Sequence, residues 1–247
     1  MTAPKGAEPF QRTSGMGDHT TSLATVSAIL AALYDRERTG QGRVVQTSLL
    51  ATGVYLWGSD LAVQLRFGRV ASVRQRDNPI NALSNYFKSA DGQWFVHNPR
   101  GGSGGWETFL KAAGRPELVD DERFASGKAR RQNARELAAE LDAAFAALPM
   151  DEIATRLNAA DLVWAPMQTP AQVAADPQIA AAGAFVDVDD GQGGTFRSPA
   201  APATFPGAET ATRPRSPHLG EHTREVLAEL GYGEGEIEAM LEAGAAV

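Results

Sequence analysis

The 247-residue sequence contains no cysteine. Disulfide bonds, thiolate nucleophiles and cysteine-ligated metal sites are therefore excluded, and a chain without cysteine fits a cytoplasmic setting. The sequence also lacks any apolar run near the roughly 18 residues that a membrane-spanning helix needs. Residues 1–15 contain no apolar signal-peptide core. We therefore expect a cytoplasmic protein with no membrane partner.

Positive charge is scarce. The chain has 23 Lys and Arg against 30 Asp and Glu, which gives a formal net charge of −7. Nucleic-acid-binding proteins neutralise phosphates with clustered Lys and Arg, and here the densest basic stretch is the single segment 66–76. We expect no nucleic-acid partner.

The composition predicts a globular α/β protein. Hydrophobic residues make up 43% of the chain and charged residues 21%, and the length suits one large domain or two small ones. Apolar residues recur at helical spacing from Leu23 to Tyr34, before a charged turn and Gly40. The β-branched segment 44–50 predicts a strand, and 51–65 predicts a helix. That strand needs neighbouring strands, which the first 43 residues do not supply.

The middle of the chain has the clearest pattern. Residues 83–89 and 93–98 predict a hairpin around an Ala-Asp-Gly turn. Further patterns predict helices at 106–114, 136–148, 150–160, 221–231 and 235–246, and a broken helix at 169–183. They also predict strands at 162–168 and 184–190. Residues 191–220 predict an extended proline-rich crossing. We divide the chain into residues 1–70, a small α/β domain at 71–150 that carries the hairpin, and 151–247.

Asp18 is the candidate catalytic residue. It follows Gly17 in the stretch GDHTTSL, just before the first helical pattern. An Asp at or near a helix N-cap accepts an otherwise unpaired backbone N–H, which is a purely structural role. The same position favours an ionised carboxylate, and free N–H groups beside it can hold an anionic oxygen. The two interpretations are compatible, and these residues leave both open.

Other polar clusters have simpler explanations. GGSGG at 101–105 lacks the Lys of a phosphate-binding loop. His19 and His97 have no metal-ligand spacing, and His218 and His222 flank Gly220 in a proline-rich segment, so we expect no metal. The carboxylate pairs at 120–121 and 189–190 lie in polar turns, where solvation explains them.

Four blocks of the sequence carry a resemblance to a known family. They are residues 17–50, which begin GDHTTSL, residues 78–94 (NPINALSNYFKSADGQW), residues 163–178 (VWAPMQTPAQVAADPQ) and residues 218–244, which begin HLGEHTREVL. In order and spacing these blocks resemble the family III CoA-transferases, which share a fold with α-methylacyl-CoA racemase. The resemblance runs from about residue 15 to the C-terminus.

The resemblance implies a fold and a chemistry. It implies the C-terminal portion of the family fold. Residues 1–70 would carry partial Rossmann-like elements from the large CoA-binding domain. A small α/β domain would follow, and then C-terminal helices that return to the large domain. It places the nucleophile on Asp18, which would pass through an aspartyl-CoA thioester. Acyl-CoA and a carboxylic acid would be the substrates, with coenzyme A as a substrate and no prosthetic group, in a homodimer.

Alternatives stay open at this point. Most of the family's Rossmann-like part lies N-terminal to the G-D block, so no CoA-binding residue transfers to this sequence. A racemase of the same fold would use Asp18 as one of two acid-base groups. A catalytically silent fragment or subunit would need an N-terminal-half polypeptide, and such a chain would expose an apolar face.

Overall fold

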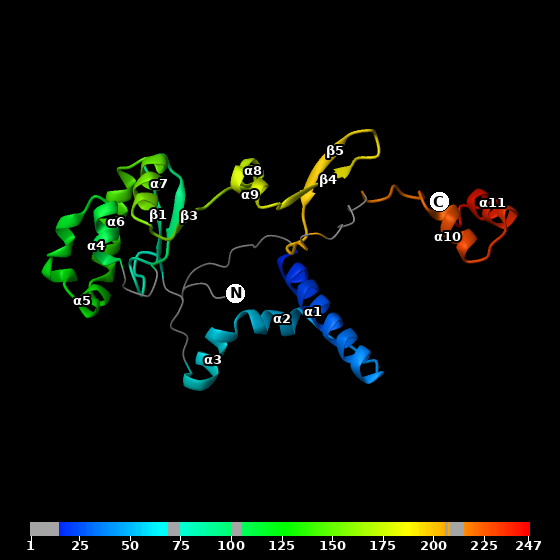
Figure 1. The fold of residues 1–247 in the computed structure, drawn as a ribbon, viewed down its shortest axis with the longest axis horizontal. Helices are drawn as coiled ribbons and strands as arrows, with labels where there is room; N and C mark the ends of the chain where they lie inside the picture. The colour runs from blue at the N-terminus through cyan, green and yellow to red at the C-terminus, as the bar shows by residue number, and fades with distance from the viewer. Residues whose placement is uncertain (1–14, 69–74, 100–104, 206, 208–214) are drawn as a thin grey trace. The chain divides into compact units, whose positions relative to one another are not determined.

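The structure is a computed structural model that describes residues 15–68, 75–99, 105–205, 207 and 215–247. The chain divides into two compact units, Met1–Met167 and Gln168–Val247. Helices and small antiparallel sheets alternate along it (Figure 1), which confirms the predicted mixture of helix and sheet.

Three helices begin the described part of the first unit. They are α1 (Met16–Thr39), α2 (Leu49–Leu56) and α3 (Gly58–Phe67). Helix α1 begins seven residues before Leu23, so it includes the whole GDHTTSL stretch. It ends at Gly40, whose φ of 70° lets its N–H bond to the Arg36 carbonyl. The single helix predicted at 51–65 is two helices, which meet at Trp57.

The prediction of a strand at 44–50 is wrong. Residues 41–48 have no regular secondary structure, and Leu49 and Leu50 already belong to α2. The segment has no strand to pair with in the described range 15–68, so its β-branched residues cannot form a ladder. Instead, the hydroxyls of Thr25 and Thr47 lie 2.8 Å apart, which holds the segment against α1.

A three-stranded antiparallel sheet forms the centre of the next region. It has the order β1 (Asn85–Lys88), β2 (Trp94–His97), β3 (Trp164–Pro166). The predicted hairpin is confirmed, and Phe87 pairs with Phe95 across it. The predicted strand at 162–168 supplies β3, which pairs with β2. We call the sheet and its helices, residues 75–167, the small domain.

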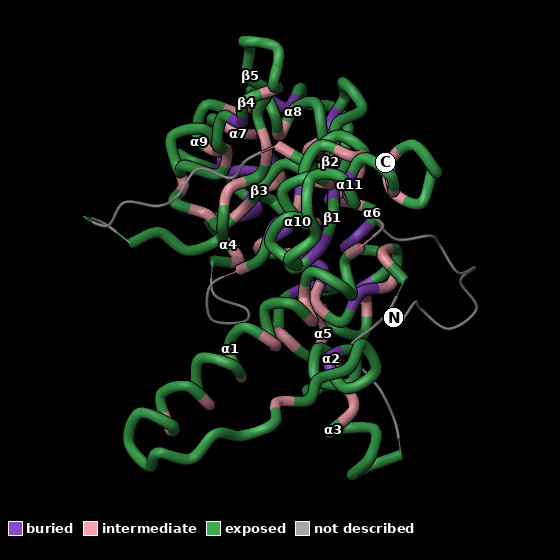
Figure 2. Tube along the Cα trace, turned by 90° about the vertical axis from the view of Figure 1, so that its right-hand side faces the viewer, coloured by how far each residue is buried: buried purple, intermediate pink, exposed green. Residues whose placement is uncertain are grey.

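Helices pack on one face of this sheet. They are α4 (Trp106–Ala112), α5 (Gly127–Gln132), α6 (Ala134–Ala146) and α7 (Met150–Ala159), with 3-10 turns at Pro116–Val119 and Glu122–Phe124. Buried residues lie on α4, α6, α7 and the two 3-10 turns but not on α5, and Figure 2 shows buried segments near the α6 and α7 labels. The predicted helices at 106–114, 136–148 and 150–160 are confirmed as α4, α6 and α7.

Four phenylalanines join the sheet to the helices. Phe87 on β1 and Phe95 on β2 project from the same sheet face, because residues directly opposite each other in an antiparallel pair share a side. The ring of Phe145 on α6 lies 5.0 Å from each of them, and 5.7 Å from the ring of Phe109 on α4. All four rings are fully buried. This phenylalanine cluster is the core of the small domain.

His97 occupies the next inward position of β2. Its side chain is fully buried and stacks on Phe109 with ring centroids 4.1 Å apart. Burial lowers the pKa of His97 below its ordinary value of 6.5, and a hydrogen bond with the Leu83 carbonyl offsets only part of that effect. His97 is therefore an uncharged member of the core at neutral pH.

The second unit contains α8 (Pro170–Ala175), α9 (Pro177–Ala181), β4 (Phe185–Asp189), β5 (Thr195–Pro199), α10 (Thr223–Glu229) and α11 (Glu234–Glu242). The broken helix, the strand at 184–190 and the two C-terminal helices were predicted. The prediction of an extended crossing at 191–220 is wrong for its first part, because β5 pairs with β4 in a hairpin. Residues 206 and 208–214 of that crossing lie outside the described residues.

Within the described residues, no helix combines the length and the apolar character needed to cross a membrane.

Replacing Phe145 with Ala should lower the free energy of unfolding of the small domain by about 3–5 kcal/mol, because the cavity it leaves is enclosed by three other rings. Urea unfolding followed by tryptophan fluorescence measures this loss. Phe67→Ala is the matched control, since Phe67 is 59% exposed and its loss should change stability by no more than about 0.5 kcal/mol. Equal losses for the two variants would contradict the proposed core.

Stability should also fall as the pH drops below 6.5, since the unfolded chain then takes up a proton that buried His97 resists. Because its folded pKa is lowered, the contribution of His97 is complete above pH 6.5 and is lost below it. Urea midpoints measured between about pH 7.5 and 5 should depend less on pH in His97→Gln than in the wild type. An equal change in His222→Gln, which alters an exposed histidine, would refute this assignment.

Candidate functional site

Asp18 lies in the first turn of α1. The helix begins at Met16 after Gly15, which has a left-handed φ of 76° and accepts the His19 N–H at 2.9 Å. Asp18 is the third helical residue, so the N-cap position belongs to Gly15 and not to Asp18. The Asp18 side chain is exposed, and in the described part of the chain no hydrogen bond or ion pair engages it.

The backbone around Asp18 is electropositive. The first N–H groups of an α-helix have no partner within the helix, and the helix dipole is positive at this end. A carboxylate in the first turn gains about 0.3–1 kcal/mol from this field when it is ionised. Asp18 therefore lies in the first turn of α1, beside backbone N–H groups at the positive end of the helix dipole.

Small residues keep the approach to this turn open. Gly17 precedes Asp18, and a Cβ built on it would meet only Leu49 Cδ2, at 3.6 Å. The start of α2 therefore lies beside the first turn of α1. The Thr20 hydroxyl donates to the Met16 carbonyl at 2.7 Å, so that hydroxyl is committed to the helix. Gly17 therefore leaves the backbone next to Asp18 without a side chain.

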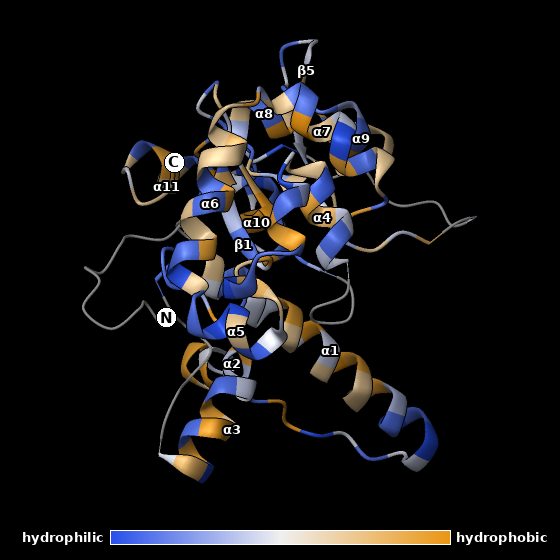
Figure 3. Cartoon of the chain, turned by 90° about the vertical axis from the view of Figure 1, so that its left-hand side faces the viewer, coloured by the Kyte–Doolittle hydropathy of each residue, from blue (hydrophilic) through white to orange (hydrophobic). Residues whose placement is uncertain are grey.

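Apolar side chains on α1, α2 and α3 are exposed. None of the residues of α1 and α3 is buried, and Thr52 is the buried residue of α2. Figure 3 shows hydrophobic residues along these helices. The large ones that are more than half exposed are Leu23, Val26, Leu30, Tyr34, Leu49, Leu50, Val54, Tyr55, Leu56, Leu65 and Phe67. We call these residues the α1–α3 apolar surface; such a surface is typical of an interaction site.

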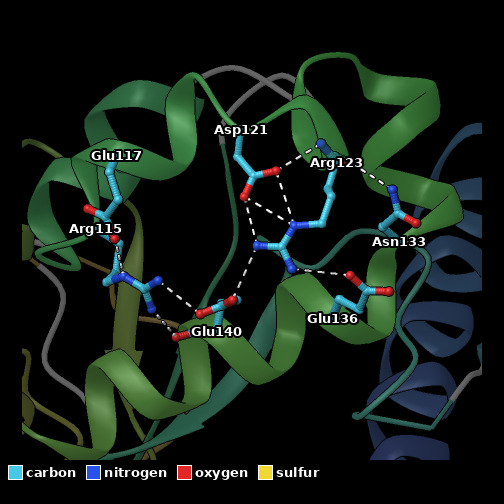
Figure 4. Close-up of polar contacts among 7 residues, drawn as sticks. All are labelled: Arg115, Glu117, Asp121, Arg123, Asn133, Glu136 and Glu140. Carbon is cyan, nitrogen blue, oxygen red and sulfur yellow. Dashed lines mark hydrogen bonds and ion pairs between the residues drawn. The ribbon is translucent and has the colours of Figure 1, made fainter.

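The paired carboxylates have structural roles in the described residues. Asp121 caps the turn at Glu122–Phe124 by accepting the Arg123 N–H at 2.8 Å, and forms an ion pair with the Arg123 side chain at 2.7 Å. Figure 4 shows Arg123 reaching Glu136 and Glu140 as well. The Arg123 side chain lowers the pKa of Asp121, so this acid is held as a carboxylate.

Asp189 and Asp190 stabilise the β4–β5 turn. Asp190 accepts the N–H groups of Gln192 at 2.7 Å and Gly194 at 3.0 Å, and Asp189 accepts that of Gly191 at 2.6 Å. These backbone donors lower the pKa of Asp190. The solvated-turn interpretation was incomplete for Asp121, Asp189 and Asp190, since each of these acids accepts a specific backbone N–H.

Where the structure describes them, the remaining candidates have structural contacts. Residues 101–104 of GGSGG lie outside the described residues, and Gly105 begins α4 with a φ of 82°. His218 donates its backbone N–H to Glu221, and the Arg215 side chain is the main reason that the pKa of Glu221 is lowered to about 2. Across the described positions, no group of three or more His, Asp or Glu side chains could hold a metal.

Sequence reasoning missed the polar role of His97. Its Nδ1 lies 2.6 Å from the Leu83 carbonyl oxygen, while its Nε2 is buried with no hydrogen-bond partner among the described residues. The alternation of inward positions on the strand at 93–98 was the one available signal. That signal places His97 inward without indicating an unpaired nitrogen.

Comparison with known proteins identifies relatives over nearly the whole chain. The sequence pattern of CoA-transferase family III matches residues 1–223. Formyl-CoA:oxalate CoA-transferases from Shigella sonnei and from Escherichia coli O139:H28 are each 28% identical over 262 aligned positions, covering 94% of this chain and 60% of the relative. The chain thus spans about 60% of the length of these curated relatives.

Solved structures agree with the sequence match. A CaiB/BaiF family protein from Brucella suis is 29% identical with a TM-score of 0.77, covering 93% of this chain and 59% of the other. A protein from Mycobacterium tuberculosis is 28% identical with a TM-score of 0.73, covering 90% of this chain and 58% of the other. The resemblance carried by the four sequence blocks is confirmed: this chain belongs to CoA-transferase family III.

Proposed function

We propose that this chain takes part in the transfer of coenzyme A between an acyl-CoA and a carboxylic acid, with Asp18 as the nucleophile. The observation that supports this most is the state of Asp18. It is a carboxylate in the first turn of a 24-residue helix, exposed, and without a side-chain partner in the described residues. A purely structural capping acid would accept a backbone N–H of the turn, as Asp121 and Asp176 do in this chain.

In the first half of the reaction, a carboxylate oxygen of Asp18 attacks the thioester carbonyl carbon of the acyl-CoA. The carbon–sulfur bond breaks, CoA leaves as a thiolate, and a mixed anhydride joins Asp18 to the acyl group. The thiolate then attacks the aspartyl carbonyl carbon. The acyl group departs as a carboxylate, and Asp18 is left as an aspartyl-CoA thioester.

The second half repeats these steps with the acceptor. The incoming carboxylate attacks the aspartyl thioester and releases the CoA thiolate, forming a new mixed anhydride. The thiolate attacks the acceptor's carbonyl carbon, which yields the new acyl-CoA and regenerates the Asp18 carboxylate. Each addition creates a negatively charged oxygen, which the positive end of the α1 dipole, in the turn that holds Asp18, is suited to stabilise.

This chemistry needs no prosthetic group, so coenzyme A enters only as part of a substrate. The curated relatives act on formyl-CoA and oxalate, according to their names. Those two compounds are therefore the first donor and acceptor to test with this chain. We retain the cytoplasm as the expected compartment, because acyl-CoA is found there.

A second polypeptide surface completes the proposed site. The α1–α3 apolar surface needs cover, and the relatives are longer than this chain. We propose that polypeptide corresponding to the rest of the relatives' length packs on this surface and supplies the CoA-binding residues. The working enzyme is then a homodimer or a complex that contains that polypeptide.

Asp18→Asn should reduce CoA transfer from formyl-CoA to oxalate in the assembled enzyme by about 1,000-fold or more, the scale on which loss of a catalytic nucleophile acts. The amide keeps the size of the side chain, so thermal unfolding should change little. Asp60→Asn is the matched control, because Asp60 is also an acid in the first turn of a helix. Its transfer rate should match that of the wild type.

Trapping tests the intermediate separately. After incubation with acyl-CoA and a hydroxylamine quench, mass spectrometry should find a hydroxamate at Asp18. A modification at another carboxylate, or full transfer activity in Asp18→Asn, would overturn the assignment.

Leu30→Glu should weaken the complex with that polypeptide, because Leu30 is 60% exposed on the α1–α3 apolar surface and a charge would be buried there. The expected loss in affinity is at least about tenfold, measured by isothermal titration. Gln41→Glu introduces the same side chain at an exposed position after α1 and should bind like the wild type. Equal affinity for Leu30→Glu and the wild type would exclude this surface as the docking face.

A further inference from the structure

The chain between α1 and α2 has the alternating sides of a β-strand, although it pairs with no strand. We call residues 43–47 the linking segment. The side chains that contact α1, or line a hollow together with it, are Arg43, Val45 and Thr47. Between them, Val44 is 87% exposed and Gln46 is exposed as well. Because successive side chains of an extended chain point to opposite sides, this alternation indicates an extended chain that lies along α1.

The spacing of its contacts supports the same conformation. Arg43 forms an ion pair with Asp35 near the end of α1. The hydroxyl of Thr47 lies 2.8 Å from that of Thr25, ten residues earlier on the helix. Ten helical residues rise about 15 Å. The four steps from Arg43 to Thr47 cover about 13 Å only when the backbone is extended.

The backbone of the linking segment is unpaired. Among the described residues, no hydrogen bond engages the N–H or carbonyl groups of residues 43–47. The range 15–68 contains no strand that could supply partners. A row of extended, unpaired backbone groups is a template on which another chain can form a ladder. The linking segment therefore has two free strand edges.

A hollow beside the linking segment can receive a side chain. It has a volume of about 350 Å³ and lies between α1 and residues 42–45. Ile29 and Leu33 give it apolar walls, and they are 43% and 41% exposed. A strand added beside the segment would direct alternate side chains toward α1. In such complexes the backbone hydrogen bonds provide affinity and the pockets for side chains provide specificity.

We propose that the linking segment is a docking edge, to which a second polypeptide adds a β-strand with an apolar side chain in the hollow beside α1. The occupant is a strand of the polypeptide that corresponds to the rest of the relatives' length, because this chain spans about 60% of those relatives and residues 15–68 contain no strand. This inference rests on the proposed function, which packs that polypeptide on the α1–α3 apolar surface. It adds that docking takes place through backbone hydrogen bonds as well as apolar contact.

The docking edge ends beside the proposed nucleophile. Leu49, which begins α2 shortly after the linking segment, lies 3.6 Å from the position of a Cβ on Gly17. The carboxyl end of the segment therefore lies near the turn that holds Asp18. In open α/β sheets, ligands bind outside the carboxyl ends of the strands. An added strand would bring the second polypeptide to the edge at which Asp18 would react.

Amide hydrogen exchange tests the docking edge directly. The probe is the part of the formyl-CoA:oxalate CoA-transferase of Escherichia coli O139:H28 that this chain does not cover. The full chain, labelled with ¹⁵N, is followed by NMR with and without the unlabelled probe. Exchange at alternate amides of residues 43–47 should slow by about 100-fold or more, because successive N–H groups of a strand point to opposite edges. Insertion between two strands of the probe would slow exchange at all five amides.

Two pairs of variants separate backbone pairing from side-chain contact. Val44→Pro and Val45→Pro each remove one N–H, and the two N–H groups lie on opposite edges. Val44→Ala and Val45→Ala shorten the same side chains and keep the N–H groups. At least one proline variant should bind the probe about tenfold more weakly than its alanine counterpart, measured by isothermal titration.

Fast exchange of all five amides in the presence of the probe overturns the proposal, as does equal affinity within both proline–alanine pairs. Protection that arises in the chain alone and increases with its concentration would assign the edge to a second copy of the chain, which overturns the proposed occupant. Hydroxylamine trapping reports on Asp18 separately. A hydroxamate at Asp18 with unprotected amides refutes the docking edge alone, and protected amides with the hydroxamate at another carboxylate refute the nucleophile alone.

Discussion

The structure depends on one requirement: every apolar face of a helix or sheet must be covered by another apolar face. The small domain meets this requirement within itself. Phe87 and Phe95 project from the sheet, and Phe109 and Phe145 project from the helices. The four rings pack together and exclude water. Helices α1, α2 and α3 carry comparable apolar side chains, yet those of the α1–α3 apolar surface remain exposed. The small domain therefore has a closed core, whereas the α1–α3 apolar surface is uncovered in the described residues.

Burial of the sheet face under the helices also determines which ionisable groups keep their charge. His97 lies on the same sheet face as Phe95, so closing the core over the phenylalanines encloses an imidazole as well. The core accepts it because the ring can lose its charge and because Leu83 offers a carbonyl to one nitrogen. In contrast, Asp121 and Arg123 lie on the outside of the helices, where both charges stay hydrated and paired.

This distinction explains how much the sequence could predict. The hairpin around Asp91 and helices α6 and α7 depend on local patterns and on contacts inside one domain, and they were predicted. The strand at 44–50 was not correct, because a strand exists only with a partner and local β-branching carries no information about that partner. Strand β5 was missed since glycine and proline on both sides of residues 195–199 suggested an irregular segment. The unpaired Nε2 of His97 results from three-dimensional packing, and no sequence pattern encodes it.

Asp18, the nucleophile that we propose, can take its position before the rest of a site is complete. Helix α1 supplies its own hydrogen bonds, so the position of Asp18 in the first turn, and the field of the helix on its carboxylate, need no contact with distant residues. A pocket for a CoA substrate is different, because it requires surfaces from several segments. The role that we propose for Asp18 therefore depends less on distant segments than the choice of substrate does. Whatever covers the α1–α3 apolar surface would exclude water from the first turn of α1, and in doing so it would strengthen the electrostatic interactions on which nucleophilic attack depends.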